Sequence, residues 1–355
     1  KYSNIHLASF ITACAKDNLS IKEIIDLTQA MIQTGEQLIW GYPFIMDKHS
    51  VGGIPGNRTT PIVVSIVAAA GLTIPKTSSR AITSPSGTSD TVEVMTPVDL
   101  DLEKIKLLIE VEGGCLAWGG AVKLSPADDI LISVERSLDI DSDAQMIASV
   151  LSKKAAAGST HVVIDIPVGP TAKVRSQEQA LKLQYYFRAV AEAIGLQVEV
   201  AISDGAQPVG KGMGPALEAM DILAILRNEP EAPEDLRQKS LHLAAILLEL
   251  SVKFSKDKSH DAALFQAQPA DRRGGAALER QADRRAQGQR AGADPRRHRC
   301  VLLQGPHRRL LRPADDAAPG RHRTRHPHRA RRFDAALAGA RRLRRDRRAA
   351  AALPA

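Results

Sequence analysis

The chain has 355 residues and a formal net charge of +8, but the positive charge is concentrated at one end. Residues 1–258 contain 24 Lys and Arg against 31 Asp and Glu, whereas residues 259–355 contain 24 Arg against 9 acidic residues. Because the first 258 residues are mildly acidic, the chain as a whole is not a basic nucleic-acid binder. Its length favours two domains.

Membrane and secretory classes are also disfavoured. No run of about 18 apolar residues predicts a transmembrane helix, and no signal-peptide pattern opens the sequence. The three cysteines, Cys14, Cys115 and Cys300, are scattered and show no C-x-x-C spacing. This usage is typical of the reducing cytoplasm and predicts neither disulfides nor a metal site.

The first elements in chain order are a helix, a loop and a second helix. Ser20 and Glu23 have the spacing of a capping box, and apolar residues then recur at helical spacing until Gly35. From Asp47 the pattern predicts a loop. A buried helix follows, with Thr60 as its N-cap. Residues 77–88 are rich in hydroxyl groups and predict a second loop.

Strands and helices then alternate. Residues 161–166 and 196–202 are apolar runs that predict buried strands, and residues 176–194 between them predict a helix with Ser176 and Gln179 as a capping box. Further helices are expected at roughly 215–227 and 234–254. This order predicts an α/β fold with a mostly parallel sheet.

Residues 259–355 have a different composition. They contain no Lys, Ile, Asn, Tyr or Met, and Ala, Arg, Pro and Gly dominate. Such a segment cannot build strands or a dense core. We expect an out-of-frame or otherwise corrupted C-terminus. The alternative is a genuine Arg-rich tail that binds nucleic-acid phosphates in a salt-sensitive way.

Residues 47–61 combine glycines with Lys48, Ser50, Thr59 and Thr60, directly before the predicted buried helix. Glycines let several backbone N–H groups point at one anion, and a helix N-terminus adds about half a positive charge. The segment is not a Walker A loop, because its lysine precedes the glycines. It predicts a phosphate site, and the alternative is a glycine-rich connector with a solvated lysine.

Two further segments carry polar side chains in patterns that suit a ligand. Ten of the fourteen residues in 77–90 have polar side chains, which suits an anion or a sugar as well as a polar surface loop. In a predicted helix near residue 150, Gln145, Ser149 and Lys153 lie four apart on one face and could bind a heterocyclic base. Asp141 precedes that helix, where an acid often only complements the helix dipole.

Three segments together resemble the thymidine/pyrimidine-nucleoside phosphorylase family: DKHSVGG, SSRAITSPSGTSD and SPADD…ASVLSKK, in this order. The stretch GNRTTPIVVSIVAAAGLTIPKTSSRAITS is most similar to the branch with AMP phosphorylases and bacterial thymidine-phosphorylase-like proteins. The resemblance covers roughly residues 1–256. It implies a small helical domain of residues 1–43 and 124–157, an α/β phosphate-binding domain of residues 44–123 and 158–258, and a substrate cleft between them. Residues 259–355 lie outside it.

The resemblance also implies residue roles. Phosphate would bind Lys48, Ser50, Gly53, Thr59, Ser78 and Thr88, and the base would contact His49, Arg136, Ser149 and Lys153. In the AMP-type branch the nucleotide contacts include Ser79, Arg80, Thr83, Ser84 and Lys173, with Asp141 as proton donor. Lys48, His49 and Asp141 are therefore the expected catalytic residues. Glu218 resembles a position that helps to hold a structural cation in some members.

The implied reaction is the phosphate-dependent cleavage of thymidine or a related pyrimidine nucleoside to a free base and (deoxy)ribose 1-phosphate. Inorganic phosphate is a co-substrate, and we expect no cofactor and no catalytic metal. AMP phosphorolysis to adenine and ribose 1,5-bisphosphate is the alternative within the enzyme class. A phosphoribosyltransferase is disfavoured because no acidic magnesium-binding motif is evident. An inactive remnant with a nucleic-acid-binding tail is the alternative from another class.

The family's usual partner is a second copy of the same chain. Its members have further helices before the position of Tyr2, and these contribute to a homodimer. The helical domain is therefore expected to be clipped at its N-terminus, which weakens the dimer. Beyond about Asp257 nothing resembles the family's C-terminal region, so the α/β domain is expected to lack its last strands.

Overall fold

The computed structural model describes residues 2–251, apart from 17, 53–55, 57, 82–85, 123 and 141. Its strands confirm the predicted α/β fold. One parallel sheet has the order β1 (Met46–Ser50), β4 (His161–Val168), β5 (Gln197–Asp204), and a second pairs β2 (Ile74–Ser78) in parallel with β3 (Gly114–Trp118). A bridge between Ile45 and Thr73 sets β1 beside β2. The strands therefore follow the order β3-β2-β1-β4-β5.

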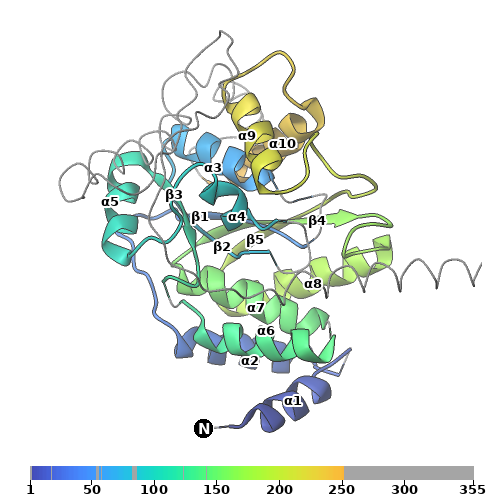
Figure 1. The fold of residues 1–355 in the computed structure, drawn as a ribbon. Helices are drawn as coiled ribbons and strands as arrows, with labels where there is room; N and C mark the ends of the chain where they lie inside the picture. Colours follow the sequence, from blue (N-terminus) through green and yellow to red (C-terminus); the bar gives the residue numbers. More distant parts are fainter. Residues whose placement is uncertain are drawn as a thin grey trace, which may run out of the picture. The chain divides into compact units, whose positions relative to one another are not determined.

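The described helices lie in layers on both faces of these strands (Figure 1). One face is covered by α3 (Thr59–Ala69), α9 (Pro215–Leu226) and α10 (Glu234–Leu250). The other face is covered by α7 (Asp143–Ala156) and α8 (Gln177–Ala193). Beyond α7 lie α1 (Asn4–Ala13), α2 (Ile21–Thr34) and α6 (Pro126–Leu138), while α4 (Thr88–Glu93) and α5 (Leu102–Glu112) pack near β3.

Burial on both faces explains the apolar strand sequences. In β4, Val163 packs into the cluster with α3, α9 and α10, whereas its neighbours Val162 and Ile164 pack into the cluster with α7 and α8. Successive side chains of a strand point to opposite faces, so a strand covered on both sides is apolar throughout. The core therefore holds the ends of β1 and β4 in fixed positions.

The predicted capping residues are present at both helix starts. Ser20 and Glu23 form the reciprocal capping box: the Glu23 N–H donates to Ser20 Oγ at 3.4 Å, and the Ser20 N–H donates to Glu23 Oε2 at 2.8 Å. At α8 the Gln179 N–H donates to Ser176 Oγ at 3.1 Å. The Gln179 side chain instead accepts from the Arg175 N–H, so the second half of that predicted box is not formed.

Three predictions of local structure are wrong. Asp47 does not open a loop but lies in β1, where buried lysines neutralise its charge. The hydroxyl-rich segment begins inside β2 rather than in a loop, and β3 was missed. The helix α3 begins at Thr59, not after a Thr60 cap. In each case tertiary partners decided what the local pattern left open.

Among the described helices, none has both the length and the apolar character needed to cross a membrane. The predictions for Gly53, Thr83, Ser84 and Asp141, and those for residues 259–355, lie outside the described residues.

Candidate functional site

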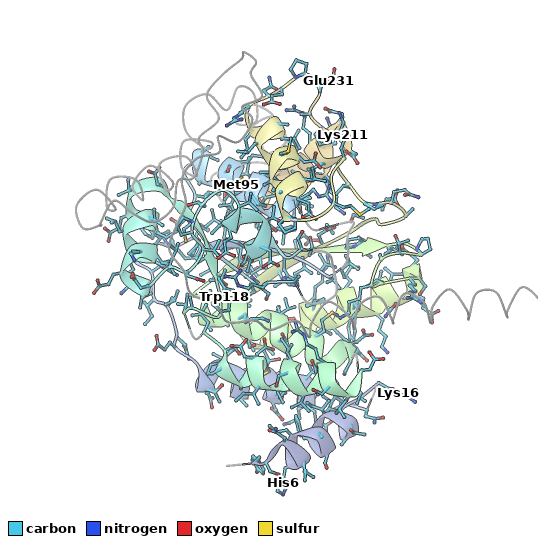
Figure 2. The ribbon with its side chains drawn as sticks, viewed as in Figure 1. His6, Lys16, Met95, Trp118, Lys211 and Glu231 are labelled. Carbon is cyan, nitrogen blue, oxygen red and sulfur yellow. The ribbon has the colours of Figure 1, made fainter. Side chains whose placement is uncertain are left out.

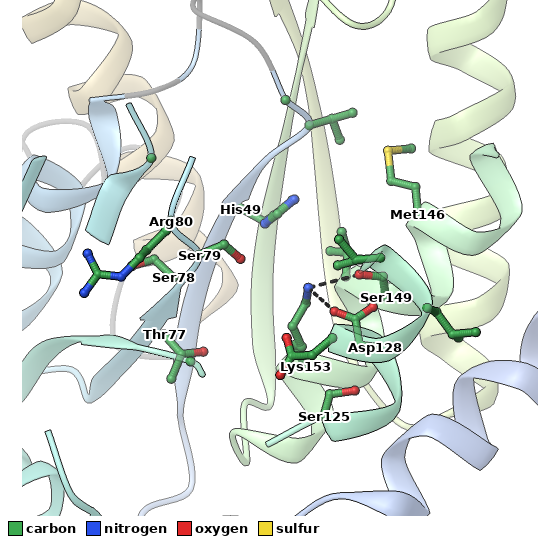
Figure 3. A pocket seen from close by; sticks show the side chains of 18 of the residues that line it. His49, Thr77, Ser78, Ser79, Arg80, Ser125, Asp128, Met146, Ser149 and Lys153 are labelled. Carbon is green, nitrogen blue, oxygen red and sulfur yellow. Dashed lines mark hydrogen bonds and ion pairs between the residues drawn. The ribbon is translucent and has the colours of Figure 1, made fainter. Parts of the chain in front are cut away.

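A cavity of about 720 Å³ lies at the carboxyl ends of β1, β2 and β3. His49, Ser78, Ser79 and Arg80 lie on its strand side, and Ser149 and Lys153 of α7 lie opposite, together with Asp128 of α6 (Figure 3). Ligands of open α/β sheets bind outside the carboxyl ends of the strands, where the strand order reverses. Here the chain runs from β1 to β2 on one side and later returns to β4 on the other side of β1.

Lys48 is fully buried at the floor of this cavity and is surrounded by hydroxyl groups. Its Nζ donates to Ser50 Oγ at 2.6 Å, to Thr59 Oγ1 at 2.6 Å and to Thr60 Oγ1 at 3.2 Å. The two threonines open α3, so the start of this helix lies against the lysine. Ser50 donates onward to Asp165 Oδ2 at 2.9 Å. An ammonium, several hydroxyls and a helix N-terminus together make an anion-binding arrangement.

The charge on Lys48 is poorly compensated. Burial lowers its pKa to about 7, with Asp165 opposing that shift and Lys239 and Lys154 adding to it. Its direct partners are neutral hydroxyls rather than carboxylates. An anion bound beside Lys48 would raise the pKa of this lysine again. The free energy of that shift would contribute to binding of the anion.

A second pair of buried lysines lies next to Lys48. Lys154 Nζ is 2.9 Å from Asp47 Oδ2, Lys76 Nζ is 3.5 Å from Asp47 Oδ1, and both lysines line the cavity. Burial raises the pKa of Asp47, but Lys154 and Lys76 outweigh it and hold that pKa below its usual value. Burial lowers the pKa of Lys76 well below its ordinary value. One carboxylate is thus shared by two lysines, so basic side chains outnumber acidic ones at this position.

Burial and the neighbouring lysines together set the protonation state of His49, a residue of β1 that lines the cavity. Burial lowers its pKa well below 6.5, and Lys154, Lys76, Lys153 and Lys48 lower it further. The imidazole is therefore neutral at pH 7. A neutral ring offers one hydrogen-bond donor and one acceptor to a ligand.

The helical side of the cavity is built on α6 and α7. Lys153 Nζ donates to Asp128 Oδ2 at 2.7 Å and to Ser149 Oγ at 3.0 Å (Figure 3). Ser149 and Lys153 share one helix face, as their spacing predicts. Asp128 is 1% exposed and was missed as a site residue, although it lies in the SPADD segment. Gln145 is buried on the same helix, and its side-chain amide has no hydrogen-bond partner among the described residues.

The hydroxyl-rich segment forms the remaining wall. Ser78 Oγ lies 2.8 Å from Ser89 Oγ, and Thr88 is the first residue of α4. Arg80 lines the cavity, but its guanidinium is held by Glu93 at 2.5 and 3.0 Å. The same group lies 4.8 Å above the ring of Trp118, which Figure 2 labels near the boundary between the strands and the helical layers. Arg80 is therefore largely committed to other protein groups.

Most of the predicted site residues gather at this one cavity. Its lining includes Lys48, His49, Ser50, Ser78, Ser79, Arg80, Thr88, Arg136, Ser149, Lys153 and Lys173. Thr59 is not a lining residue, but its hydroxyl accepts a hydrogen bond from Lys48. Arg136 also donates to the Ala81 carbonyl at 3.4 Å. Glu218 lies away from the cavity and faces Arg58. Sequence reasoning missed Lys76, Lys154, Asp128 and Trp118 as site residues, although the first three lie within the segments that carry the family resemblance.

Comparison with known proteins identifies the family. The profile of the glycosyl transferase family, a/b domain, matches residues 43–276, which include every strand described above. The chain belongs to this family. The match is consistent with the phosphorylase resemblance of the DKHSVGG and SSRAITS segments.

Two relatives confirm that resemblance. "Putative thymidine phosphorylase 1" of Acidovorax sp. (strain JS42) is 62% identical over 250 residues, which cover 70% of this chain and 49% of the relative. "Putative thymidine phosphorylase" of Hahella chejuensis (strain KCTC 2396) is 61% identical over 249 residues, with the same coverage. The chain thus spans about half the length of the curated relatives it matches.

Solved structures confirm the fold alone. Anthranilate phosphoribosyltransferase of Thermus thermophilus matches with a TM-score of 0.59 at 16% identity and covers 79% of this chain and 95% of that chain. The enzyme of the same name from Saccharomyces cerevisiae, in complex with PRPP and Mg, matches with a TM-score of 0.61 at 15% identity, covering 80% and 86%.

Proposed function

We propose that this cavity binds inorganic phosphate and a nucleoside, and that phosphate displaces the base to give a free base and a pentose 1-phosphate. Thymidine or a related pyrimidine nucleoside is the proposed substrate. The observation that carries the proposal is the position of Lys48 and its hydroxyls across one cavity from Lys153, Ser149 and Asp128. The names of the relatives support the same reaction class.

The Lys48 end suits phosphate. Phosphate must be held against the anomeric carbon with its charge compensated, and Lys48 supplies a charge that its neutral partners leave available. Ser50, Thr60 and Thr88 add hydroxyls that line the cavity. Holding two reactants in an attack geometry can supply several kcal/mol of the barrier, up to about 7–11 in ideal cases.

The Lys153 end suits the base. Cleavage of the glycosidic C–N bond leaves negative charge on the departing base, which donors aimed at it stabilise. Lys153 and Ser149 provide such donors, and Asp128 fixes the ammonium in place. The neutral His49 adds a hydrogen bond without a full charge. Arg136 lines the same cavity. Asp141 remains our proposed proton donor because of the family resemblance.

The dimensions are compatible with two small reactants. A volume of about 720 Å³ lies within the range of roughly 300–1,000 Å³ that is usual for small-molecule sites. Lys48, Lys76 and Lys154 line the cavity, so a ligand that carries negative charge is favoured over a neutral one.

AMP phosphorolysis is the second candidate, and the number of cations at the cavity favours it. Lys173 and Arg136 line the cavity in addition to Lys48, Lys76, Lys153 and Lys154. A nucleoside 5′-monophosphate would bring a second phosphate, and these side chains could compensate its charge. The reaction would then yield ribose 1,5-bisphosphate rather than ribose 1-phosphate.

A panel of substrates tests both candidates. Thymidine, uridine and AMP are each incubated with the full chain in single turnover, with and without phosphate, and the free base is measured by chromatography. We expect base release that requires phosphate, from thymidine on the first proposal and from AMP on the second. Absence of phosphate-dependent base release from all three would overturn both.

A further inference from the structure

Arg58 is a buried cation that directly precedes the two threonines at Lys48. Its side chain has no exposed surface, and its Nη1 lies 3.0 Å from Asp221 Oδ2 of α9. Its Nη2 lies 3.6 Å from Glu218 Oε1, also of α9. A buried guanidinium without its carboxylates is strongly disfavoured, so this contact fixes the start of α3 against α9.

Glu218 also contacts α4, whose first residue, Thr88, lines the cavity. Its Oε2 accepts a hydrogen bond from the hydroxyl of Thr91 in α4 at 3.1 Å, and its Oε1 accepts from the Gly214 N–H at 3.2 Å. The Thr91 hydroxyl lies 3.2 Å from the carbonyl oxygen of Gly87, the residue before Thr88. A single buried carboxylate therefore contacts both segments that carry the proposed phosphate ligands.

The helix α9 itself takes no part in the cavity. None of its residues lines the cavity, and it packs on α3 and α4 from the side opposite to α6 and α7 (Figure 1). Lys211, which Figure 2 labels beside α9, donates its backbone N–H to Asp221 at 2.8 Å. These contacts place α9 behind the proposed phosphate site, where it can act only through other residues.

We propose that Glu218 is a positioning residue that sets the separation between Thr59–Thr60 and Thr88, acting through Arg58 and Thr91. This inference rests on the proposed function, because it assumes that the two segments bind one phosphate. Donors fixed in advance bind an anion more tightly than donors that must be ordered on binding. Glu218 therefore contributes to phosphate affinity without touching phosphate.

The test is phosphate binding to the full chain at pH 7, measured by titration calorimetry. The variant Thr91→Val removes the hydroxyl that reaches Glu218 and keeps the size of the side chain, and Thr91→Ser restores the hydroxyl. We expect phosphate affinity to fall about fivefold in Thr91→Val, the equivalent of one hydrogen bond, and to return in Thr91→Ser. Nucleoside affinity should stay within about twofold in both variants, since the base side is built on α6 and α7.

Thr96→Val is the matched control. Thr96 is also buried and follows α4 in the chain, but its hydroxyl has no hydrogen-bond partner among the described residues. The phosphate affinity of the Thr96→Val variant should equal that of the unmodified chain. Glu218→Gln should lower phosphate affinity more than Thr91→Val does.

The outcomes distinguish failure of the role of Glu218 from failure of the proposed function. Equal phosphate affinity in Thr91→Val and the unmodified chain would overturn the role of Glu218 while leaving the proposed function intact. Equal losses of phosphate and nucleoside affinity would also overturn it, because a merely structural role predicts that pattern. If the unmodified chain binds no phosphate, the proposed function fails and this inference fails with it.

Discussion

The two ends of the cavity hold their lysines in opposite ways. Lys48 is fully buried in a strand and donates to three neutral hydroxyls, whereas the side chain of Lys153 is 26% exposed on a helix and is paired with the carboxylate of Asp128. A buried charge without a counter-charge is costly, and an arriving anion relieves that cost. An ammonium already paired with a carboxylate attracts an anion less strongly, but the hydrogen bond to the carboxylate fixes its position. On the proposed function, this difference assigns phosphate to the Lys48 end and the base to the Lys153 end.

Replacing Lys48 should have the largest effect. Lys48→Ala removes the only cation that contacts both Ser50 and the start of α3 among the described residues. We expect phosphate-dependent base release to fall about 10³-fold, at the upper end of the effect of losing one electrostatic donor. Single-turnover rates and phosphate calorimetry measure the change. Lys104→Ala, on the exposed surface of α5, is the control. A variant that retains normal phosphate affinity would contradict the assignment of Lys48.

Removing the charge of Asp128 should affect the other end selectively. Asp128→Asn keeps the size of the side chain but releases Lys153 from its ion pair. We expect kcat/KM for the nucleoside to fall about 10- to 30-fold, in the range of a lost buried charged hydrogen bond, with little change in phosphate affinity. Steady-state kinetics, with the nucleoside and phosphate varied in turn, separates the effect on the nucleoside from the effect on phosphate. Asp26→Asn, on the exposed face of α2, serves as the control. Equal losses for the nucleoside and for phosphate would show that the two ends of the cavity do not bind different reactants.

The pKa of Lys48 predicts a pH dependence at the phosphate end. Because burial lowers this pKa to about 7, the unliganded protein loses the lysine proton as pH rises above 7. Binding of an anion must then restore that proton, so affinity falls by up to about tenfold per pH unit above 7. Sulfate is the probe, since it remains a dianion between pH 6 and 9.

Calorimetry in two buffers of different ionisation enthalpy measures this proton uptake directly. The unliganded protein should become more stable from pH 7 toward pH 9, because the unfolded chain keeps a lysine proton that the folded chain has released. Lys48→Met should remove this contribution. A sulfate affinity that is constant between pH 7 and 9 would exclude Lys48 as the titrating group.

Arg80 should have the smallest effect, although it lines the cavity. Its guanidinium is engaged by Glu93 and Asp90 and lies over Trp118, so it is not free to meet a ligand. Arg80→Gln should lower the melting temperature by a few degrees at most, since partly exposed ion pairs contribute only about 0.2–1 kcal/mol. Nucleoside affinity should change by less than about twofold. A tenfold loss would show that Arg80 leaves its acidic partners to bind substrate.

Much of the fold could be predicted from local patterns. The apolar run of β4, the capping residues Ser20 and Ser176, and the apolar helix after residue 60 all determine structure within a few residues of themselves. The motifs at Lys48, Ser78 and Ser149 also pointed to ligand binding, because few other uses explain so many donors in a short segment. These predictions depend on near neighbours alone.

Other features depended on residues far apart in the sequence. Asp47 and Lys48 do not predict a strand, but β1 pairs along its whole length with β4, and Lys76 and Lys154 compensate the buried charge of Asp47. Asp128 became a site residue only when α6 packed beside α7 and placed it against Lys153. Charged residues can be buried only with partners, and the partners are supplied by tertiary packing. The sequence by itself determined the α/β architecture and the chemistry available to it, while the tertiary structure decided which charges are paired and which remains open to an anion.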